Sequence, residues 1–186
     1  MALFQCNTSN VDEMRHGRPQ TVLNDKERPN GVIVTLGETQ ESVARELDHC
    51  HSIQEGALSE VAGAFVVVAP EINVQQYRTI DGQIGKFVLE ADETYTAYML
   101  VKHDRLEYSE AYFEAVPAVG DKVNVKAGEG LAPRFSANGQ ALRVVSVVDL
   151  WLPVMLQANS ASAQGAGNLA KLMPESCKMI KLEVEQ

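Results

Sequence analysis

The sequence predicts a mainly β protein, a small β-barrel or β-sandwich with an extended N-terminal arm and little helix. Runs rich in Val, Thr, Tyr and Ile recur along the chain, and these residues suit a pleated, half-buried surface. Most of the runs are short and end at Gly, Pro or Asp, and no long stretch keeps a clear helical period. A chain of 186 residues with 45% hydrophobic residues is large enough for one good core, with or without a small appended lobe.

Residues 1–30 are predicted to form the arm, and residues 31–186 to form the β-rich body. The arm is polar, is interrupted by Gly17, Pro19 and Pro29, and shows no sustained periodicity. Its four acidic residues balance four basic ones, whereas the body holds 21 acidic and 12 basic residues and carries the whole net charge of −9. We expect such a segment to become ordered when it lies against a neighbouring molecule.

In the first part of the body, residues 32–36 are expected to form a short strand that ends at Gly37. Residues 64–69, with the sequence AFVVVA, form a continuous apolar run that is typical of a strand buried on both faces. Residues 71–85 have the composition of a loop and contain a good Asp-Gly turn signal.

Residues 38–52 are ambiguous. They contain helix formers and place Val43, Leu47 and Cys50 near one face of a helix, so the local pattern favours a helix. The same residues lie between strand-like segments, however, and the sequence at 49–51 is equally compatible with a strand.

The stretch 85–130 predicts a small β-module. Residues 87–91 and 94–101 read as two strands. A turn follows at 116–122, where a proline presets φ and a glycine permits a positive φ. Beyond this turn, apolar and polar residues alternate through 122–127, which indicates a strand with one buried face.

The last part of the chain predicts a long hairpin. Residues 128–139 read as a loop, and residues 141–148 have the strongest β character in the sequence. Residues 158–169 are small and of low complexity, which indicates a flexible surface loop. Residues 178–185 alternate regularly, so we expect a terminal strand with one apolar face, paired with the strand before the loop.

Asp48-His49-Cys50-His51 is the only cluster that resembles a metal site. On a strand, His49 and His51 would share a face and offer two ligands, but no third or fourth ligand is evident. Cys50 beside two histidines could be an activated thiol, although neighbours in sequence are rarely placed as nucleophile and base. The sequence therefore predicts no metal site and no cofactor. The chain's three cysteines are odd in number and widely spaced, which indicates free thiols.

Several function classes are excluded by pattern and composition. The glycines at 128–130 and 165–167 lack the spacing of phosphate-binding loops, no nucleophile elbow is present, and the acidic residues read as solvated faces, so no enzyme is predicted. An acidic body repels phosphate backbones, so no nucleic-acid partner is expected. No apolar run approaches the ~20 residues that span a bilayer, and a secretory signal is lacking, so we expect no membrane partner and synthesis in a cytoplasm.

The order of segments resembles a known family. NGVIVTLGE, VAGAFVVVAPEI, a tyrosine-containing loop, FVLEADETYT, PAVGDKVNVKAGEGL and a terminal hairpin follow one another as in a family of tailed-bacteriophage head proteins, which decorate or cement an icosahedral shell. The resemblance spans about Asn30 to Gln186. Its most specific pieces are Val67-Val68-Ala69-Pro70-Glu71 and Val119-Gly120-Asp121-Lys122-Val123.

This resemblance implies a structural role without catalytic residues. The implied partners are the major capsid protein and other copies of the chain, as a dimer or trimer. The implied location is the exterior of the capsid, after assembly in the host cytoplasm.

Two alternatives stay open. One is a carbohydrate or cell-surface binding module built from Trp151 and the loop 158–169, although a lone Trp inside an apolar run is more often core. The other is a metal protein or enzyme centred on His49 to His51.

Overall fold

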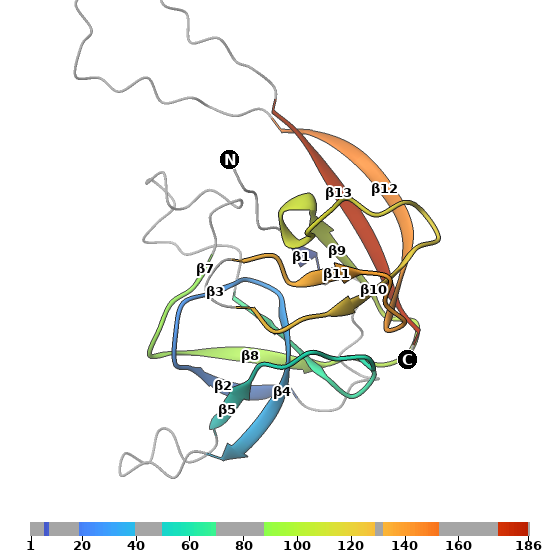
Figure 1. Ribbon diagram of the computed structural model, residues 1–186. Helices are drawn as coiled ribbons and strands as arrows, with labels where there is room; N and C mark the ends of the chain where they lie inside the picture. The colour runs from blue at the N-terminus through green and yellow to red at the C-terminus, as the bar shows by residue number, and fades with distance from the viewer. Residues whose placement is uncertain are drawn as a thin grey trace, which may run out of the picture.

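The computed structural model describes residues 6–7, 19–39, 50–69, 88–128, 132–152 and 175–185 (Figure 1). Regular structure in these residues is strand, apart from one turn of 3-10 helix, η3 (Glu110–Tyr112), so the prediction of a mainly β fold with a small barrel is confirmed. The strands are β1 (Cys6–Asn7), β2 (Gln20–Asn24), β3 (Arg28–Pro29), β4 (Val32–Thr39), β5 (Cys50–Gln54), β6 (Phe65–Val68), β7 (Val88–Leu89), β8 (Glu93–Met99), β9 (Arg105–Ser109), β10 (Lys122–Val125), β11 (Phe135–Ala137), β12 (Leu142–Leu152) and β13 (Glu175–Val184).

Five strands close into a barrel in the order β2-β5-β4-β6-β8, in the lower part of Figure 1. β2 completes the circle because it pairs with β5 on one side and with β8 on the other. The β2–β5 pair is parallel, with Thr21 opposite Cys50, and the other pairs are antiparallel. Closure leaves the barrel strands without an open edge.

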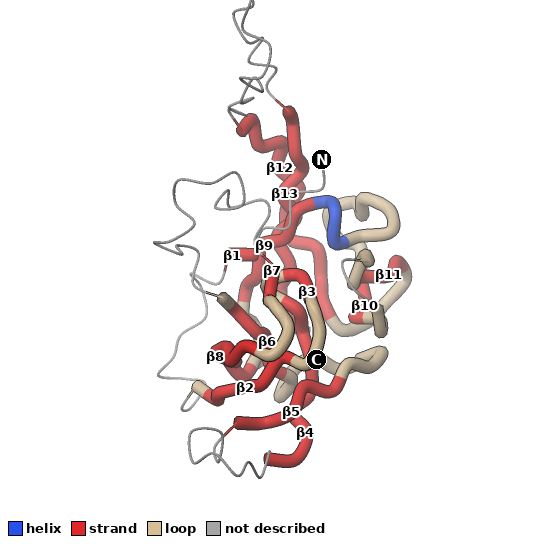
Figure 2. Tube along the Cα trace, turned by 90° about the vertical axis from the view of Figure 1, so that its left-hand side faces the viewer, coloured by secondary structure: helices blue, strands red, loops and turns tan. Residues whose placement is uncertain are grey.

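The other large unit is a six-stranded sheet in the order β1-β9-β13-β12-β10-β11. Its two longest strands, β12 and β13, pair from Leu142 opposite Val184 to Leu152 opposite Glu175. β9 accompanies β13 only as far as the row in which Met179 lies opposite Ser109. The outer part of the β12–β13 hairpin therefore continues past β9, and Figure 2 shows it projecting from the body.

Strand β6 is shared between the two hydrophobic cores. Val66 and Val67 are neighbours on this strand and both are fully buried, so their side chains point to opposite faces. Val66 belongs to the larger core, under the six-stranded sheet, and Val67 belongs to the core of the barrel. The expectation that residues 64–69 form a strand buried on both faces is confirmed, and the reason is that β6 separates the two cores.

Rings fill the centre of the larger core. Tyr108, Tyr112, Phe113 and Phe135 are all buried, and the ring centroids of Tyr108 and Phe135 lie 4.8 Å apart in an edge-on arrangement. The hydroxyl of Tyr108 donates a hydrogen bond of 2.8 Å to the carbonyl of Gly31, just before β4. The hydroxyl of Tyr112 donates to the carbonyl of Asn30. These two bonds connect β9 and η3 to the segment that leads into the barrel strand β4.

Other predicted features of the body are also confirmed. In β13 the alternating residues Ile180, Leu182 and Val184 are fully buried, and β12 is the paired strand of the predicted hairpin. The turn before β10 has Gly120 at a φ of +93°, and the carboxylate of Asp121 accepts a hydrogen bond of 2.8 Å from the amide of Ala118. Strand β7 is shorter at its C-terminal end than the strand expected at 87–91, because residues 91 and 92 already form a turn that leads to β8.

The prediction of an arm over residues 1–30 is wrong for residues 20–29. Those residues form β2, a barrel strand, and β3, which pairs with β7. The predicted end of a strand at Gly37 is also wrong, because β4 continues to Thr39 through an irregular register. A side chain at Gly37 would meet the hydroxyl of Ser52 on β5 at 2.3 Å, so glycine allows the strands to stay close there.

Two further expectations differ from the structure. The C-terminal end of the ambiguous segment 38–52 is strand β5 from Cys50 onward, rather than helix, because it pairs with β2 and β4. The predicted loop 128–139 contains the short strand β11, which pairs with β10. The predicted loops 71–85 and 158–169 lie outside the described residues, as does most of the segment before Gln20.

Candidate functional site

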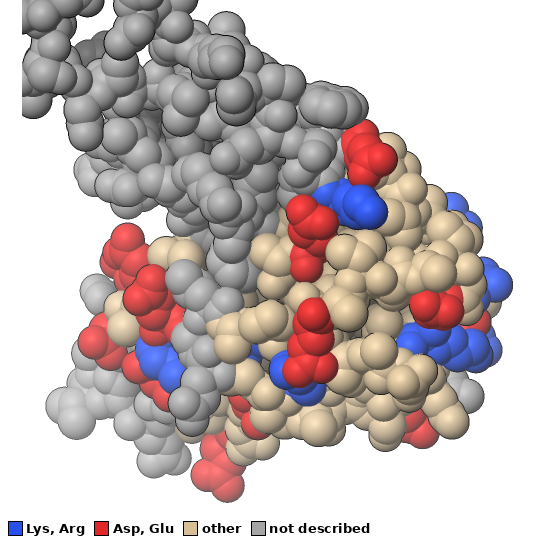
Figure 3. Space-filling model, turned by 45° about the horizontal axis from the view of Figure 1, so that its top comes forward, with Lys and Arg blue, Asp and Glu red and all other residues tan. Residues whose placement is uncertain are grey.

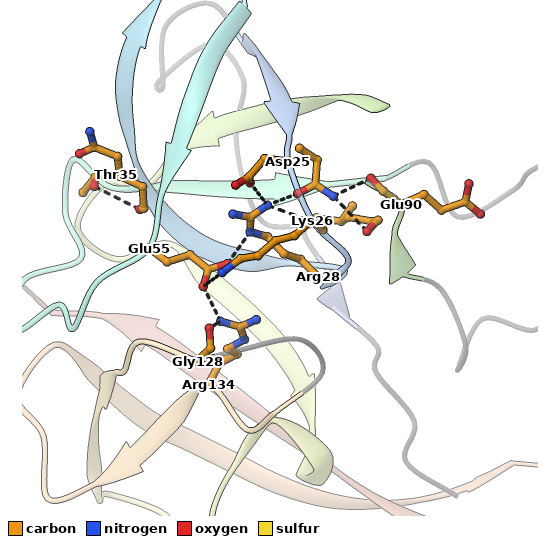
Figure 4. Close-up of polar contacts among 11 residues, drawn as sticks. Asp25, Lys26, Arg28, Thr35, Glu55, Glu90, Gly128 and Arg134 are labelled. Carbon is orange, nitrogen blue, oxygen red and sulfur yellow. Dashed lines mark hydrogen bonds and ion pairs between the residues drawn. The ribbon is translucent and has the colours of Figure 1, made fainter. Parts of the chain in front are cut away.

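Two buried arginines and one carboxylate form the most unusual polar feature of the described residues (Figure 4). Arg28 and Arg134 are each 2% exposed, and the side chain of Glu55, which lies between them, is 10% exposed. Charged side chains are rarely buried in this way unless they are paired. We refer to Arg28, Glu55 and Arg134 as the arginine–glutamate bridge.

The bridge connects parts of the chain that are far apart. Arg28 lies on β3, Glu55 directly follows the barrel strand β5, and Arg134 directly precedes β11 of the six-stranded sheet. Figure 4 shows the two arginines reaching Glu55 from opposite sides. The bridge therefore joins the barrel to the sheet through charged hydrogen bonds, beside the apolar contacts of β6.

Each oxygen of Glu55 serves a different arginine. Oε1 accepts a hydrogen bond from Nε of Arg28. Oε2 accepts one of 3.0 Å from Nη1 of Arg134 and lies 3.5 Å from Nζ of Lys26. Hydrogen bonds of this charged kind are about twice as strong as neutral ones. A neutral side chain of the same shape could not accept from both arginines, because an amide has one oxygen and one NH₂ group.

Further bonds fix the direction of the Arg28 guanidinium group. Nη1 of Arg28 donates to Oδ1 of Asn24 and lies 2.6 Å from Oδ1 of Asp25. Asn24 is itself fully buried, and its Nδ2 donates to the carbonyls of Leu89 (3.0 Å) and Glu90 (2.6 Å). Because the amide uses both its oxygen and its NH₂ group, Asn24 links Arg28 on β3 to the C-terminal end of β7.

Arg134 is anchored by its backbone as well as by its side chain. Its amide donates to the carbonyl of Tyr112 (2.8 Å), and its carbonyl accepts from the amide of Lys126 (2.9 Å). Its Nη1 also donates to the carbonyl of Gly128 at 2.8 Å. A side chain at Gly128 would meet the same guanidinium at 2.9 Å, so glycine leaves room for this arginine.

The electrostatics of the bridge keep Glu55 ionised. Burial raises the pKa of this carboxyl, but the hydrogen bond from Arg28 and the charge of Arg134 outweigh burial and hold the pKa below its ordinary value. An ionised carboxylate saturated by cationic donors is suited to holding two segments together. General acid or base work instead calls for a pKa near the working pH.

A second charged cluster lies on the outer face of β9, β13 and β12. Glu183 accepts from Nδ1 of His103 (3.1 Å) and lies 3.3 Å from Nη2 of Arg105 and 3.6 Å from Nη2 of Arg143. The hydrogen bond from His103 and the two arginine charges outweigh burial and lower the pKa of Glu183. The three partners of Glu183 are exposed, so these pairs add little stability individually.

Part of the described surface shows the same mixing of charges. In the right-hand part of Figure 3, Lys and Arg side chains lie beside Asp and Glu side chains. Two pairs of this kind are Lys181 with Glu107 (2.6 Å) and Lys126 with Glu114.

The residues that the sequence singled out for metal or thiol chemistry fall on the barrel. Cys50 begins β5 and is buried as a free thiol, and the next residue, His51, is half-buried with Nδ1 3.3 Å from the carbonyl of Gly37. Successive strand residues point to opposite faces, so these two side chains diverge. His49 lies outside the described residues. Within the part of the chain that the structure describes, no group of three or more His, Cys, Asp or Glu could hold a metal ion.

The elements of the predicted binding module are only partly described. Trp151 lies in β12 opposite Ser176, near the outer end of the hairpin, and the loop 158–169 lies outside the described residues. Among the glycine motifs, the carbonyl of Gly128 serves Arg134, and residues 129–130 and 165–167 are also outside the described part.

Sequence reasoning missed the arginine–glutamate bridge. Its ion pairs join residues 27 and 79 positions apart, and each charged residue stands in a stretch that reads as a polar loop. A weak signal was present for Arg28 alone, since it lies beside Pro29, four residues before the apolar run that begins at Val32.

Comparisons of the chain with protein-family models, with curated proteins and with solved structures found no match. In the described residues, no helix has the length and apolar character needed to cross a membrane.

Proposed function

We propose that this protein is a structural virion protein, which binds the outside of a tailed-bacteriophage capsid shell and decorates or stabilises it. The observation that carries the proposal is the resemblance of its ordered segments, from Asn30 onward, to the head decoration family. Its proposed partners are the major capsid protein and further copies of itself. Its proposed location is the capsid exterior.

The positions of the most specific segments support the proposal. Val67, Val68 and Ala69 belong to the β6 region, which lies between the two cores. The segment from Val119 to Val123 forms the turn that leads into β10, with a positive φ at Gly120. Proteins with the same fold are expected to share the segments that form its core strands and turns, and both of these segments are of that kind.

The use of charge in the molecule fits the same role. The carboxylate of Glu55 is saturated by Arg28 and Arg134, so the buried charges serve to join two β units. A protein that covers a shell needs a body that resists unfolding, and it does not need strong binding by each copy. Many weak contacts repeated by icosahedral symmetry act together as avidity.

Occupancy measurements on shells test the proposal. Purified protein is added to shells that lack it, the shells are separated on a density gradient, and the bound copies are counted against the major shell protein. Saturation at a regular ratio of copies per shell subunit supports decoration. Failure to bind at any protein concentration contradicts it.

To test whether the N-terminal segment attaches the protein to the shell, the deletion must end before strand β2. Removing residues 2–29 would delete the barrel strand β2 and would test folding instead of attachment. Removing residues 2–18 leaves β2 in place, and a matched variant shortened within 158–169 controls for loss of chain length. We expect the first variant to lose shell occupancy and the second to retain it. Wild-type occupancy by the first variant would contradict the attachment role.

A carbohydrate or cell-surface binding module displayed on the virion is the second candidate. The observation in its favour is that β12 and β13 stay paired out to Leu152 and Glu175, beyond the end of β9, so the ribbon carries Trp151 to its outer end. Trp is an amphipathic platform for sugar contacts. Silence on a glycan array, together with a blue-shifted Trp emission, would end this candidate.

A further inference from the structure

In the part of the chain that the structure describes, strand β12 has an open edge on the side away from β13. β10 pairs with β12 only at Leu142 and Arg143. The turn before β10 covers one more residue, since Val144 accepts a hydrogen bond from the amide of Gly120 (2.9 Å) and donates one to the carbonyl of Asp121 (2.8 Å). Beyond this point β13 is the only strand, in the described ranges, that pairs with β12.

The open edge runs from 146 to 152 and begins at the register irregularity between Val144 and Ser146. It presents a row of backbone N–H and C=O groups that can pair with another chain. Natural edges are usually protected by charged residues, especially lysines, by prolines, by bulges or by short length. This stretch, SVVDLWL, contains no lysine or proline, and its protection is limited to Asp149 and the bulge at its start. Within it, Val148 is 52% exposed.

The shape of the hairpin gives a second reason to expect a partner. Past the row of Met179 and Ser109, β12 and β13 pair with each other and with no further described strand. A two-stranded ribbon is marginally stable in water, whereas sheets of three or more strands with an apolar face are stable. A strand added at the β12 edge would therefore stabilise the base of the projecting ribbon.

We propose that β12 pairs along this edge, in antiparallel orientation, with β12 of a second copy of the chain. An antiparallel pair of identical strands is self-complementary about one two-fold axis, so every contact is made twice. The product is a continuous ribbon of four strands in which the 146–152 edge of each chain faces its copy. A two-fold pairing of one edge with itself closes at the dimer. This inference stands independently of the proposed virion function.

The sequence also selects a register. An axis at Asp149 would place two carboxylates directly opposite each other, which is destabilising. An axis at Val148 instead places this exposed side chain against its copy, and sets Asp149 opposite Val147 and Ser146 opposite Leu150. The pairing is therefore expected to be centred on Val148.

The test is the molar mass of the purified full-length chain, measured by light scattering after gel filtration over a range of concentrations. We expect wild-type protein to have twice the chain mass of 20.3 kDa. Val148→Lys places two cations face to face and should raise the dimer dissociation constant by about tenfold or more. Val116→Lys is the matched control, since Val116 is 43% exposed and lies outside β12, and it should leave the dimer intact.

Each result decides for or against the inference. A wild-type monomer at every concentration, a trimer, or a dimer that Val148→Lys leaves unchanged would each overturn it. If Val148→Lys fails to fold, as judged by its circular dichroism, hydrogen exchange of the wild type decides instead. Amides within residues 146–150 should exchange more slowly as the protein concentration rises, and exchange that is independent of concentration would contradict the pairing.

Discussion

Replacing Glu55 by Gln should strongly destabilise the fold. The two carboxylate oxygens serve different arginines, and both arginines are 2% exposed. Gln keeps one acceptor but turns an NH₂ group toward the other guanidinium and leaves two buried positive charges. Removing one partner of a buried ion pair costs about 3–5 kcal/mol. Because Asn24 and the carbonyl of Gly128 still accept from the arginines, we expect the lower end, about 3 kcal/mol.

The assay is urea unfolding of Glu55→Gln and wild type, supported by thermal unfolding. For a chain of this size, about 3 kcal/mol corresponds to a fall in Tm of roughly 6–12 °C. Glu114→Gln is the matched control, because its ion pair with Lys126 is largely exposed, and it should change the free energy of unfolding by about 1 kcal/mol or less. If the two variants differ by less than about 0.5 kcal/mol, the bridge does not hold the two β units together and the reasoning is refuted.

Three further predictions concern the body. Gly139→Ala should lower the free energy of unfolding by about 1–3 kcal/mol, because the new Cβ would lie 2.1 Å from the backbone nitrogen of Asn124. Gly56→Ala is the control, since Gly56 has open space around it, and it should leave the free energy of unfolding unchanged. Equal urea midpoints for the two variants would contradict this prediction. Tyr108→Phe should cost about 1–2 kcal/mol, since the carbonyl of Gly31 loses its buried donor; an unchanged Tm would contradict this. The lowered pKa of Glu55 means that its stabilisation is complete above its unfolded pKa of about 4.5 and is lost as the pH falls through the folded value. Between about pH 7 and pH 3, wild type should therefore lose more unfolding free energy than Glu55→Gln, and equal losses would argue against an ionised bridge.

Local pattern was sufficient where a strand has one buried face. The alternation of Ile180, Leu182 and Val184 predicted the terminal strand, and all three side chains are fully buried. The apolar run around Val66 and Val67 likewise predicted a strand with two buried faces. In both places the side chains that define the strand also make its main contacts, so a short window of sequence contains the information.

Local pattern failed where distant partners decide the structure. Residues 20–24 look like part of a polar segment, yet they form a barrel strand because β5 and β8 supply neighbours on both sides. The local pattern of residues 38–52 favours a helix, and the same barrel makes the end of this segment, from Cys50 onward, a strand. Backbone hydrogen bonds to distant strands outweigh weak local propensities in both segments.

The arginine–glutamate bridge was not predictable for a related reason. Charged residues in loop-like stretches normally face solvent, and this is the correct interpretation for most of them. Arg28 and Arg134 are exceptions because folding brings Glu55 between them, across separations of 27 and 79 residues. Pairing at such distances leaves no trace in a local window.

The most direct test of the central claim is quantitative mass spectrometry of density-purified virus particles from the source system. The proposed role predicts peptides of this chain at a copy number comparable to that of the major shell protein. A handful of copies per particle would instead indicate a vertex, portal or tail location. Complete absence from purified particles would contradict the claim that this is a structural virion protein.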